Sequence, residues 1–490
     1  MQNNILIIIC DQLSAQALQS YGNHYNSGGA MNQLAAEGTL FEQAYCNAPL
    51  CQPSRASFWT SRYTFETQVD TNLRQLSFPH IADTISTLGE VFQAGGYQTM
   101  HFGKEHDYGS LRGFTLVENK ERVIPREDPA INLAYETFLD IDTTTKVTDW
   151  LASPQAKDQP FLAVADLQNP HNICNYIGEN QNGSKPFLDD SQLPPLPDNF
   201  DTPDMANRPE YIQYLCCAHR RLMHAAHWSR LDYRRYLYAY HDYINRVEKQ
   251  VAQILDTLAA ARLEENTLVV FLADHGEGMA AHGLVTKYGN FYEESLRVPL
   301  IFRGPGIPVG RRISGPVSLL DLKPTLQSYA GLAATAEDRG HNLLPVLLDE
   351  SVDQAGQPYV VASWIDEFSG YTVPGRMYRF GQYKYTAYRD FIHRDSDEVS
   401  IHEELYDLAK DPGEQCTLIL DEAYSAVLEQ ARNGLAAYCT STGDPFYSSL
   451  PDYDRSLYRL HKPGFSNHEG PCAVDVHILN RPKNYAARNF

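Results

Sequence analysis

The stretch from Cys51 to Arg62 (CQPSRASFWTSR) places reactive side chains of several types within twelve residues. Pro53 disfavours helix around it, and residues 54–59 are then predicted to form a helix. A side chain at the positive N-terminal end of a helix is well placed to handle an anion. Arg55 adds a guanidinium that forms charge-assisted hydrogen bonds. A single free Cys is otherwise a small buried hydrophobic side chain, so Cys51 alone leaves both interpretations open.

Two predicted strands lead to residues that could bind a metal ion. The apolar runs 4–10 and 267–273 are typical of buried parallel strands. Ligand sites in open α/β sheets lie at the carboxyl edge of the strands. The residues that follow these two strands are Asp11, Gln12, Asp274 and His275. An Asp after a strand is also a common cap, so residue type alone does not decide between a cap and a metal ligand.

Basic side chains follow two further predicted strands, at 97–102 and 161–166, and the 267–273 strand. They are Lys104, His106, His171, His282 and Lys287. Pro170 makes a turn that projects His171 from the carboxyl edge of its strand. Each of these residues, taken alone, is compatible with a solvated surface position.

Taken together, these segments resemble the type I sulfatases. The pattern Cys-x-Pro-Ser-Arg-x-Ser-x-x-Thr-x-Arg is similar to the signature of that family, and its core is what the modifying machinery of the family recognises. Other segments resemble further family motifs, in family order: Gly-Lys-x-His at 103–106, Pro-His at 170–171, Asp-His-Gly at 274–276, Lys287 and Glu-x-x-x-Arg-Val-Pro at 293–299. The commoner second metal carboxylate is replaced by Gln12, so this site has one negative charge fewer. The resemblance runs from residue 4 to about 415.

The resemblance implies a nucleophile and a cofactor. The family oxidises its signature Cys, here Cys51, to formylglycine, which requires a formylglycine-generating enzyme as a partner, and the hydrated aldehyde is the nucleophile. One divalent cation would be held by Asp11, Gln12, Cys51, Asp274 and His275. Oxygen-rich ligands favour Ca²⁺, and the imidazole leaves Mg²⁺ or Mn²⁺ open. The cation would polarise a sulfuryl oxygen and lower the pKa of the aldehyde hydrate.

The resemblance also implies roles for the basic residues. Arg55 and Lys104 would neutralise the aldehyde hydrate and the sulfate. His171 or Lys287 would give a proton to the leaving alcohol. His106 would remove the second hydroxyl proton, which expels sulfate and restores the aldehyde.

The segment 172–235 is predicted to be an insertion that shapes the substrate pocket. It contains a cluster of basic residues within twelve positions: His219, Arg220, Arg221, His224, His227 and Arg230. The cluster is either a solvated helix face or a wall that supplies positive charge to an anionic substrate. We expect His219, Arg220, Arg221, His224, His227 and His282 to contact substrate. The preferred substrate is a sulfated sugar, such as a unit of a glycosaminoglycan or algal polysaccharide.

The predicted fold class is α/β, with a large mixed, mainly parallel central sheet flanked by helices, similar to alkaline phosphatase. A smaller C-terminal α+β subdomain would be built on a short antiparallel sheet. The expected divisions are a catalytic domain at 1–350, the subdomain at 351–440 and a tail at 441–490. Within the first, residues 31–37, 84–94 and 240–262 are predicted helices; in the last of these, apolar residues recur at helical spacing.

Composition narrows the partners and the compartment. Lys and Arg number 40 against 61 Asp and Glu, a net charge of −21. This argues against nucleic acid and against an anionic membrane surface as partners, and favours a small ester or chain end over a long polyanion.

No apolar run of the sequence is long enough to span a membrane. Residues 5–10 are interpreted as a strand and not a signal peptide, which predicts a cytoplasmic protein unless a leader is removed from a periplasmic or secreted one. The nine Cys predict no disulfide framework.

Three alternatives remain at this stage. A phosphonate monoester or phosphodiester hydrolase of the same superfamily would use a similar metal site. A catalytically silent glycan-binding protein would keep Cys51 as a thiol. A cysteine hydrolase would pair the Cys51 thiolate with His106, which the Pro-Ser-Arg context disfavours. The oligomeric state is not predicted.

Overall fold

The strand β1 (Asn4–Cys10) lies at the centre of the fold, and every residue from Ile5 to Cys10 is fully buried. A strand covered on both faces needs apolar side chains at successive positions, which explains its continuous Ile-rich run. The structure is a computed structural model. It describes residues 3–25, 28–69, 72, 81–117, 133–180, 190–204, 207–209, 212, 225, 228–287, 289–352, 354, 357–365, 374–390 and 400–447.

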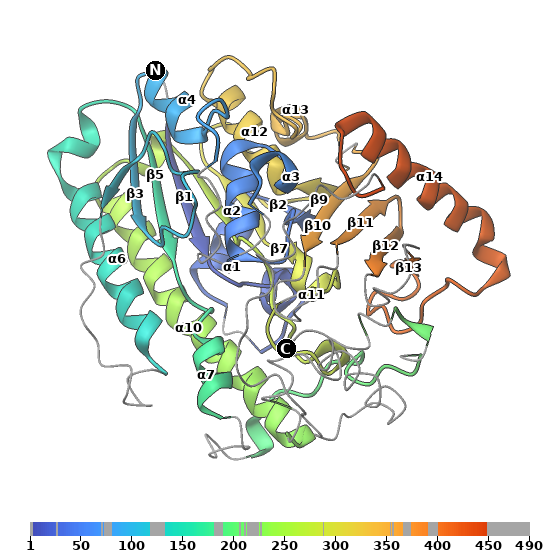
Figure 1. Ribbon diagram of the computed structural model, residues 1–490. Coiled ribbons are helices and arrows are strands. Elements are labelled where there is room, and N and C mark those ends of the chain that lie inside the picture. The colour runs from blue at the N-terminus through green and yellow to red at the C-terminus, as the bar shows by residue number, and fades with distance from the viewer. Residues whose placement is uncertain are drawn as a thin grey trace, which may run out of the picture.

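β1 belongs to a large mixed sheet. Its other strands are β2 (Thr39–Tyr45), β3 (Gln98–Gly103), β4 (Thr115–Val117), β5 (Phe161–Leu167), β6 (Thr267–Leu272), β7 (Arg297–Val298), β8 (Leu300–Arg303) and β9 (Arg311–Ser318). The order is β4-β3-β5-β1-β6-β8-β2-β7, with β9 paired to β2. Strands β4, β3, β5, β1 and β6 are mutually parallel, whereas β8 is antiparallel to both β6 and β2. The carboxyl ends of the parallel strands therefore meet at one edge (Figure 1).

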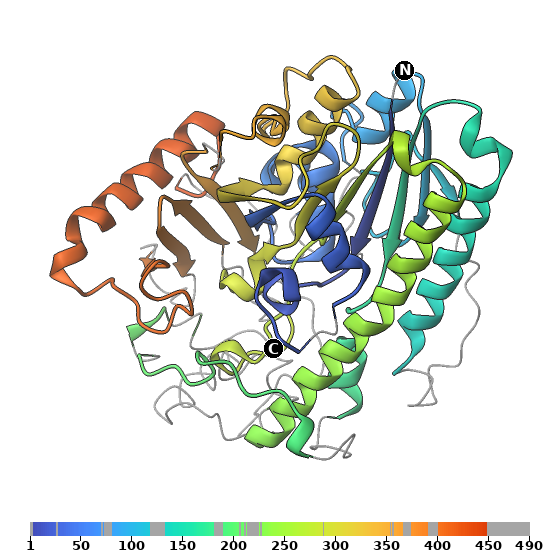
Figure 2. The ribbon, with the colours of Figure 1, turned by 180° about the vertical axis from the view of Figure 1, so that it is seen from behind.

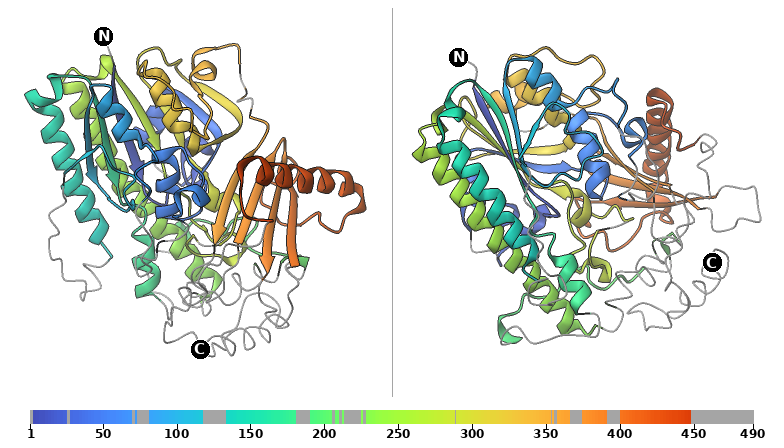
Figure 3. Two further views of the ribbon diagram at one scale, coloured as in Figure 1. Left: turned by 45° about the horizontal axis from the view of Figure 1, so that its top comes forward. Right: turned by 60° about the vertical axis from the view of Figure 1, so that its left-hand side comes forward.

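Helices cover both faces of this sheet. α6 (Tyr135–Ala152) and α10 (Arg230–Ala260) pack together on one face, and Figure 2 shows α10 running along the length of the sheet. α2 (Cys51–Thr60), α4 (Leu88–Ala94) and α12 (Leu322–Tyr329) lie on the other face (Figure 3). The shorter helices are α1 (Ala30–Glu37), α3 (Thr64–Thr67), α7 (Ile173–Glu179), α11 (Glu293–Leu296) and α13 (Leu344–Leu348).

A second, smaller sheet lies beside the first (Figure 3). It is antiparallel, in the order β10 (Val360–Ile365), β11 (Pro374–Phe380), β12 (Tyr383–Asp390) and β13 (Ser400–Asp407). The helix α14 (Ser425–Thr442) lies across one of its faces and buries Leu428, Ala431 and Leu435 against Tyr385 and its neighbours. Both the mainly parallel central sheet and the small antiparallel sheet of the prediction are thus confirmed.

Most element predictions within the described residues are confirmed, and several helices differ in their bounds. The 240–262 helix starts earlier, at Arg230, with Ser229 as its N-cap and Asp232 closing a capping box. The 84–94 helix starts at Leu88, after the N-cap Thr87. The divisions at residues 350 and 440 stay predictions. No helix among the described residues is long and apolar enough to cross a membrane.

The helix that carries the Cys motif also starts earlier than predicted. α2 begins at Cys51, not at Ser54, because Pro53 falls in its first turn. The N–H groups of a first turn have no intrahelical acceptor, so a residue without one is tolerated there. Ser54 is the first residue of α2 whose N–H forms a helical hydrogen bond, which it donates to the Leu50 carbonyl at 3.1 Å. The side chain at position 51 is therefore placed in the first turn of the helix.

Candidate active site

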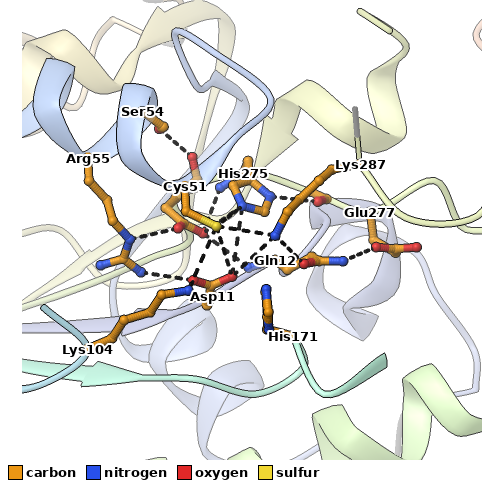
Figure 4. Close-up of polar contacts among 12 residues, drawn as sticks. Asp11, Gln12, Cys51, Ser54, Arg55, Lys104, His171, His275, Glu277 and Lys287 are labelled. Carbon is orange, nitrogen blue, oxygen red and sulfur yellow. Dashed lines mark hydrogen bonds and ion pairs between the residues drawn. The ribbon is translucent and has the colours of Figure 1, made fainter. Parts of the chain in front are cut away.

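The site lies where the carboxyl edge of the large sheet meets the start of α2 (Figure 4). The parallel register aligns Cys10 with Leu167, and Gly103 with Asp166, so that the residues following β1, β3 and β5 emerge side by side. Asp274 follows β6 at the same edge. The structure confirms the predicted convergence of these strand ends.

Two glycines allow the backbone to turn into the site. Gly103 has a φ of 105°, and a Cβ there would lie 2.0 Å from the Asp166 carbonyl oxygen. Only glycine fits this left-handed and crowded position, from which the chain delivers Lys104. A Cβ on Gly276 would lie 1.9 Å from the Glu294 carbonyl oxygen, so glycine is needed directly after His275 as well.

Four side chains form a cluster with the donor types of a metal site. Asp11, Cys51, Asp274 and His275 each place one ligand-type atom within 4.8 Å of the others, and all are buried. Cys51 Sγ lies 3.2 Å from His275 Nε2 and 3.9 Å from Asp11 Oδ1. Buried carboxylates and an imidazole at this spacing suit one divalent cation.

The His275 ring is oriented so that one nitrogen is available to a cation. Its Nδ1 lies 2.9 Å from the Gly276 carbonyl oxygen, which can only accept a hydrogen bond. Nδ1 therefore carries the proton, and Nε2 turns its lone pair toward Asp11 and Cys51. This arrangement is typical of metal-binding imidazoles. The residues present thus fit a cation.

Arg55 supplies the counter-charge for the carboxylates. Its Nε lies 2.9 Å from Asp274, its Nη1 2.5 Å from Asp166 and its Nη2 3.3 Å from Asp11. Arg55 is 1% exposed and the three acids are fully buried. Burial and the neighbouring Asp11 raise the pKa of Asp274. Burial also acts to raise the pKa of Asp11, but nearby cations, chiefly Lys104, hold it well below its usual range.

Gln12 is held firmly beside the cluster. Its φ is 66°, a left-handed conformation that a non-glycine residue keeps only when its surroundings fix it. Its N–H donates to Asp274 Oδ1 at 3.1 Å and its carbonyl accepts from the Tyr240 hydroxyl at 2.7 Å. The side-chain amide donates to Glu277, and Lys287 Nζ lies 2.5 Å from Oε1. The amide oxygen therefore faces the same region as Lys287.

Two lysines and a histidine surround the Cys51 sulfur. Lys287 Nζ lies 3.2 Å from Sγ and Lys104 Nζ 3.8 Å from it. Burial acts to raise the pKa of the Cys51 thiol, but Lys104, Lys287 and His275 outweigh it and lower that pKa well below its ordinary value. The site therefore stabilises negative charge on whatever atom stands at the end of side chain 51.

Two further histidines differ in charge state. Burial lowers the pKa of the His106 ring, which favours the neutral base. Burial also acts to lower the pKa of His171, but Glu136 overcomes it and raises that pKa to about 10. Nδ1 of His171 lies 2.8 Å from Glu136 Oε1. Opposite shifts of two titratable groups at one site are typical of a paired base and acid.

The structure brings together most of the predicted site residues: Asp11, Gln12, Cys51, Arg55, Lys104, His106, His171, Asp274, His275 and Lys287. The predicted substrate residues His219, Arg220, Arg221, His224 and His227 lie outside the described residues. His282 is 1% exposed, with Nδ1 2.9 Å from Thr202 Oγ1 and its ring in tilted contact with the Tyr292 ring. Its contact with substrate stays a prediction. Arg230 forms an exposed ion pair with Asp201.

Three acidic residues at the site were missed by the sequence reasoning. Asp166 holds Arg55, Glu277 holds the Gln12 amide, and Glu136 holds His171. Glu277 is fully buried and also accepts hydrogen bonds from the Tyr236 hydroxyl and the Thr286 N–H. For Asp166 a signal existed, because it is a charged residue inside an apolar strand. For Glu136 and Glu277 the sequence offers no such signal.

Comparison with known proteins agrees with this geometry. Residues 3–332 match the sulfatase family, and residues 281–440 match the family described as N-sulphoglucosamine sulphohydrolase, C-terminal. The chain therefore belongs to the sulfatase family, within the alkaline phosphatase-like superfamily, and is a hydrolase of sulfate esters.

Similar proteins cover nearly the whole chain. It is 41% identical to the Delta 4,5-hexuronate-2-O-sulfatase of Bacteroides thetaiotaomicron over 96% of both chains. A crystal structure of a putative sulfatase from the same species superimposes with a TM-score of 0.83 at 40% identity, over 96% of this chain and 99% of that one. A solved 2-O GAG sulfatase has a TM-score of 0.82 at 39% identity, again over 96% and 99%.

Proposed function

We propose that this sulfatase removes the 2-O-sulfate from a Δ4,5-unsaturated hexuronate at the end of a glycosaminoglycan-derived saccharide. The observation that carries the chemistry is the presence, around the side chain of Cys51, of two lysines and of two half-buried histidines whose pKa values are shifted in opposite directions. The position of the sulfate is supported by the extent of similarity to the hexuronate-2-O-sulfatase and the 2-O GAG sulfatase.

The cation is proposed to be Ca²⁺, held by Asp11, Gln12, Asp274 and His275 together with side chain 51. Carboxylate and amide oxygens outnumber the single imidazole nitrogen, which favours a hard cation, although Mg²⁺ and Mn²⁺ also accept this set. When bound, such a cation withdraws electron density from a sulfuryl oxygen and from the nucleophile. Isothermal titration of chelator-treated protein with each of the three ions tests the assignment, and tighter binding of Mg²⁺ or Mn²⁺ than of Ca²⁺ would overturn it.

The nucleophile is proposed to be formylglycine made from Cys51 by a separate modifying enzyme. The hydrated aldehyde supplies a hydroxyl group where the thiol stands, and its second hydroxyl gives a route for release of sulfate that a thiol lacks. Lys104 and Lys287 stabilise negative charge at that position, as their effect on the pKa of Cys51 indicates. Arg55 keeps the carboxylates Asp11 and Asp274 charged and in place.

The two histidines divide the proton transfers. His171 is protonated at neutral pH and gives its proton to the leaving sugar hydroxyl, because an alcohol leaves poorly as an alkoxide. His106 favours the neutral state and accepts a proton from side chain 51, with which it interacts electrostatically. The balance is one ester and one water converted to one alcohol, one sulfate and one proton.

A chain end is a better substrate for this protein than a long polymer. The net charge of −21 repels a polyanion lying across the surface, whereas a terminal residue only needs to enter the cationic site. The basic residues between 219 and 227 remain proposed substrate contacts.

The test uses unsaturated disaccharides that each carry a single sulfate, at the uronate 2-O, the hexosamine 6-O or the amine. Protein made alongside the modifying enzyme should release sulfate from the 2-O-sulfated disaccharide at least a hundredfold faster than from the others. The matched control is Cys51→Ala, which should be inactive on all three. Faster turnover of a phosphonate or phosphate ester than of every sulfate would instead support the phosphonate hydrolase, and binding without turnover would support the glycan-binding protein.

A further inference from the structure

The first turns of α6 hold the loop that carries His171 through several hydrogen bonds. Asp140 accepts hydrogen bonds from the N–H groups of Gln168 at 2.5 Å and Asn169 at 3.0 Å. The Asn169 amide donates to Asp140 at 2.8 Å and to Thr137 Oγ1 at 3.2 Å. Positions 136, 137 and 140 share one helix face through their spacing of three and four residues. The loop therefore has little freedom to move relative to α6.

Glu136 is the member of this face that reaches the His171 ring. Its Oε1 lies 2.8 Å from Nδ1, and its side chain is 8% exposed. Its other oxygen, Oε2, is buried and has no hydrogen-bond partner among the described residues. The backbone N–H of Glu136 donates to Asn172 Oδ1 at 3.2 Å, which ties the helix to the residue next to the histidine. A buried carboxylate with a single side-chain partner requires that partner to carry the compensating charge.

We propose that Glu136 is a positioning residue for sulfate-ester hydrolysis: its carboxylate holds the Nδ1–H of His171 at 2.8 Å and so directs Nε2 toward the nucleophile. Figure 4 shows the His171 ring beside Asp11 and Gln12 and directed toward the cluster. The inference rests on the proposed role of His171 as the general acid. It adds a residue, remote in sequence from every motif, that sets the orientation and the charge state of that acid.

The other groups around this pair act on the pKa of His171 in both directions. Lys287 and Lys104 act to lower the pKa of His171, and Cys174 on α7 acts in the opposite direction. Asp140, one turn along α6, and Tyr243 on α10 also lie near Glu136. Burial, and to a smaller extent the Glu136 charge, raises the pKa of each of them. Tyr243 contacts the same region by donating to the Leu133 carbonyl at 2.9 Å. Glu136 is thus the neighbour that most strongly favours the charged His171 ring.

The test replaces Glu136 with Gln, which keeps the shape and removes the charge. Without the carboxylate, burial and the two lysines should bring the pKa of His171 from about 10 to 6.5 or below. At pH 8 the protonated fraction would then be about 3% or less, so kcat/KM should fall at least about 30-fold and its alkaline limb should move down by more than two pH units. The control Asp142→Asn, on the exposed side of the same helix, should change neither quantity.

Two further measurements separate a positioning role from a structural one. Deuterium exchange at the histidine C2 position, followed by mass spectrometry, gives the pKa of His171 without substrate. In a His171→Ala background, Glu136→Gln should have almost no further effect on kcat/KM, because Glu136 acts through that ring. Glu136→Asp should recover part of the pKa shift.

The outcomes are distinguishable. An unchanged pKa of His171 in Glu136→Gln would overturn the inference whatever the activity, and so would additive losses in the double variant. A lowered pKa in Glu136→Gln, in an enzyme whose wild type hydrolyses another sulfate ester but not the 2-O-sulfated hexuronate, would support the role of Glu136 and reject the proposed function.

Discussion

Removing the Arg55 charge should destabilise the protein strongly, because this guanidinium compensates three fully buried carboxylates at 2.5–3.3 Å. Arg55→Met keeps most of the side-chain volume and removes the charge. Breaking a buried ion pair by deleting one partner costs about 3–5 kcal/mol. We expect a loss within this range in the free energy of unfolding at pH 7.5, measured by urea denaturation of the unmodified protein in chelator. Unmodified protein is used because Arg55 lies within the motif that resembles the family's recognition sequence for conversion of the Cys.

The loss should depend on cation and on pH in a defined direction. A cation that binds only the folded state stabilises it by about 2.7 kcal/mol at a hundred times its Kd, so Ca²⁺ should restore a large part of the loss. Unpaired buried carboxylates have raised folded-state pKa values, so the variant should regain stability as pH falls from 7 toward 5. In the wild type the pKa of Asp11 is lowered from 3.8, so its contribution to stability stays nearly constant between pH 7 and pH 5, and the gap between the two proteins should narrow through the gain of the variant.

The matched control is Arg62→Met. Arg62 pairs with Glu66 and with the exposed Glu337, and its removal should cost about 1 kcal/mol or less. A loss below about 1 kcal/mol for Arg55→Met, or a loss that is the same at pH 5 and pH 7 and with or without Ca²⁺, would refute the assignment of Arg55 as the shared counter-charge.

Three further predictions concern the neighbours of the nucleophile. Lys287→Ala should raise the pKa of the Cys51 thiol in unmodified protein, because it removes the ammonium 3.2 Å from the sulfur. The pKa is measured from thiolate absorbance, with Cys51→Ser as the reference, and an unchanged pKa would contradict the geometry. Glu277→Gln should weaken Ca²⁺ binding about tenfold, because it leaves one acceptor oxygen for the three donors Gln12, Tyr236 and Thr286. Calorimetry that gives an unchanged Kd would show that Gln12 is held otherwise. Asp444→Ala should destabilise the small sheet by about 3–5 kcal/mol, since it leaves the buried Arg376 without its bidentate partner. Hydrogen exchange of the β11 amides should become faster, and unchanged protection of these amides would contradict the prediction.

The sequence predicted the residues at strand ends because parallel strands bring their carboxyl termini to one edge. Asp11 and Asp274 follow apolar strands that are each recognisable alone, and β-pairing then fixes their proximity. The roles of Cys51, Lys104 and His171 came from motifs whose order along the chain matches a family. These features are local in sequence, and the topology of the sheet determines only how they are brought together.

The sequence could not predict which acid supports which base. Glu136 lies in a helix where a polar residue is usually solvated, and it is 35 positions from His171. Glu277 and Gln12 are 265 positions apart, and their contact depends on the packing of α10 against the strand ends. The start of α2 was misplaced because a proline in a first turn resembles a helix boundary. The substrate contacts between 219 and 227, the compartment and the oligomeric state stay predictions.

The most direct test of the central claim is the mass of the tryptic peptide that contains Cys51, from protein made with and without the modifying enzyme. Conversion to formylglycine lowers the mass of the peptide by about 18 Da, and the fraction converted should be proportional to the rate of sulfate release from the 2-O-sulfated disaccharide. Full sulfatase activity in protein whose Cys51 peptide keeps the mass of an unmodified thiol would contradict the account.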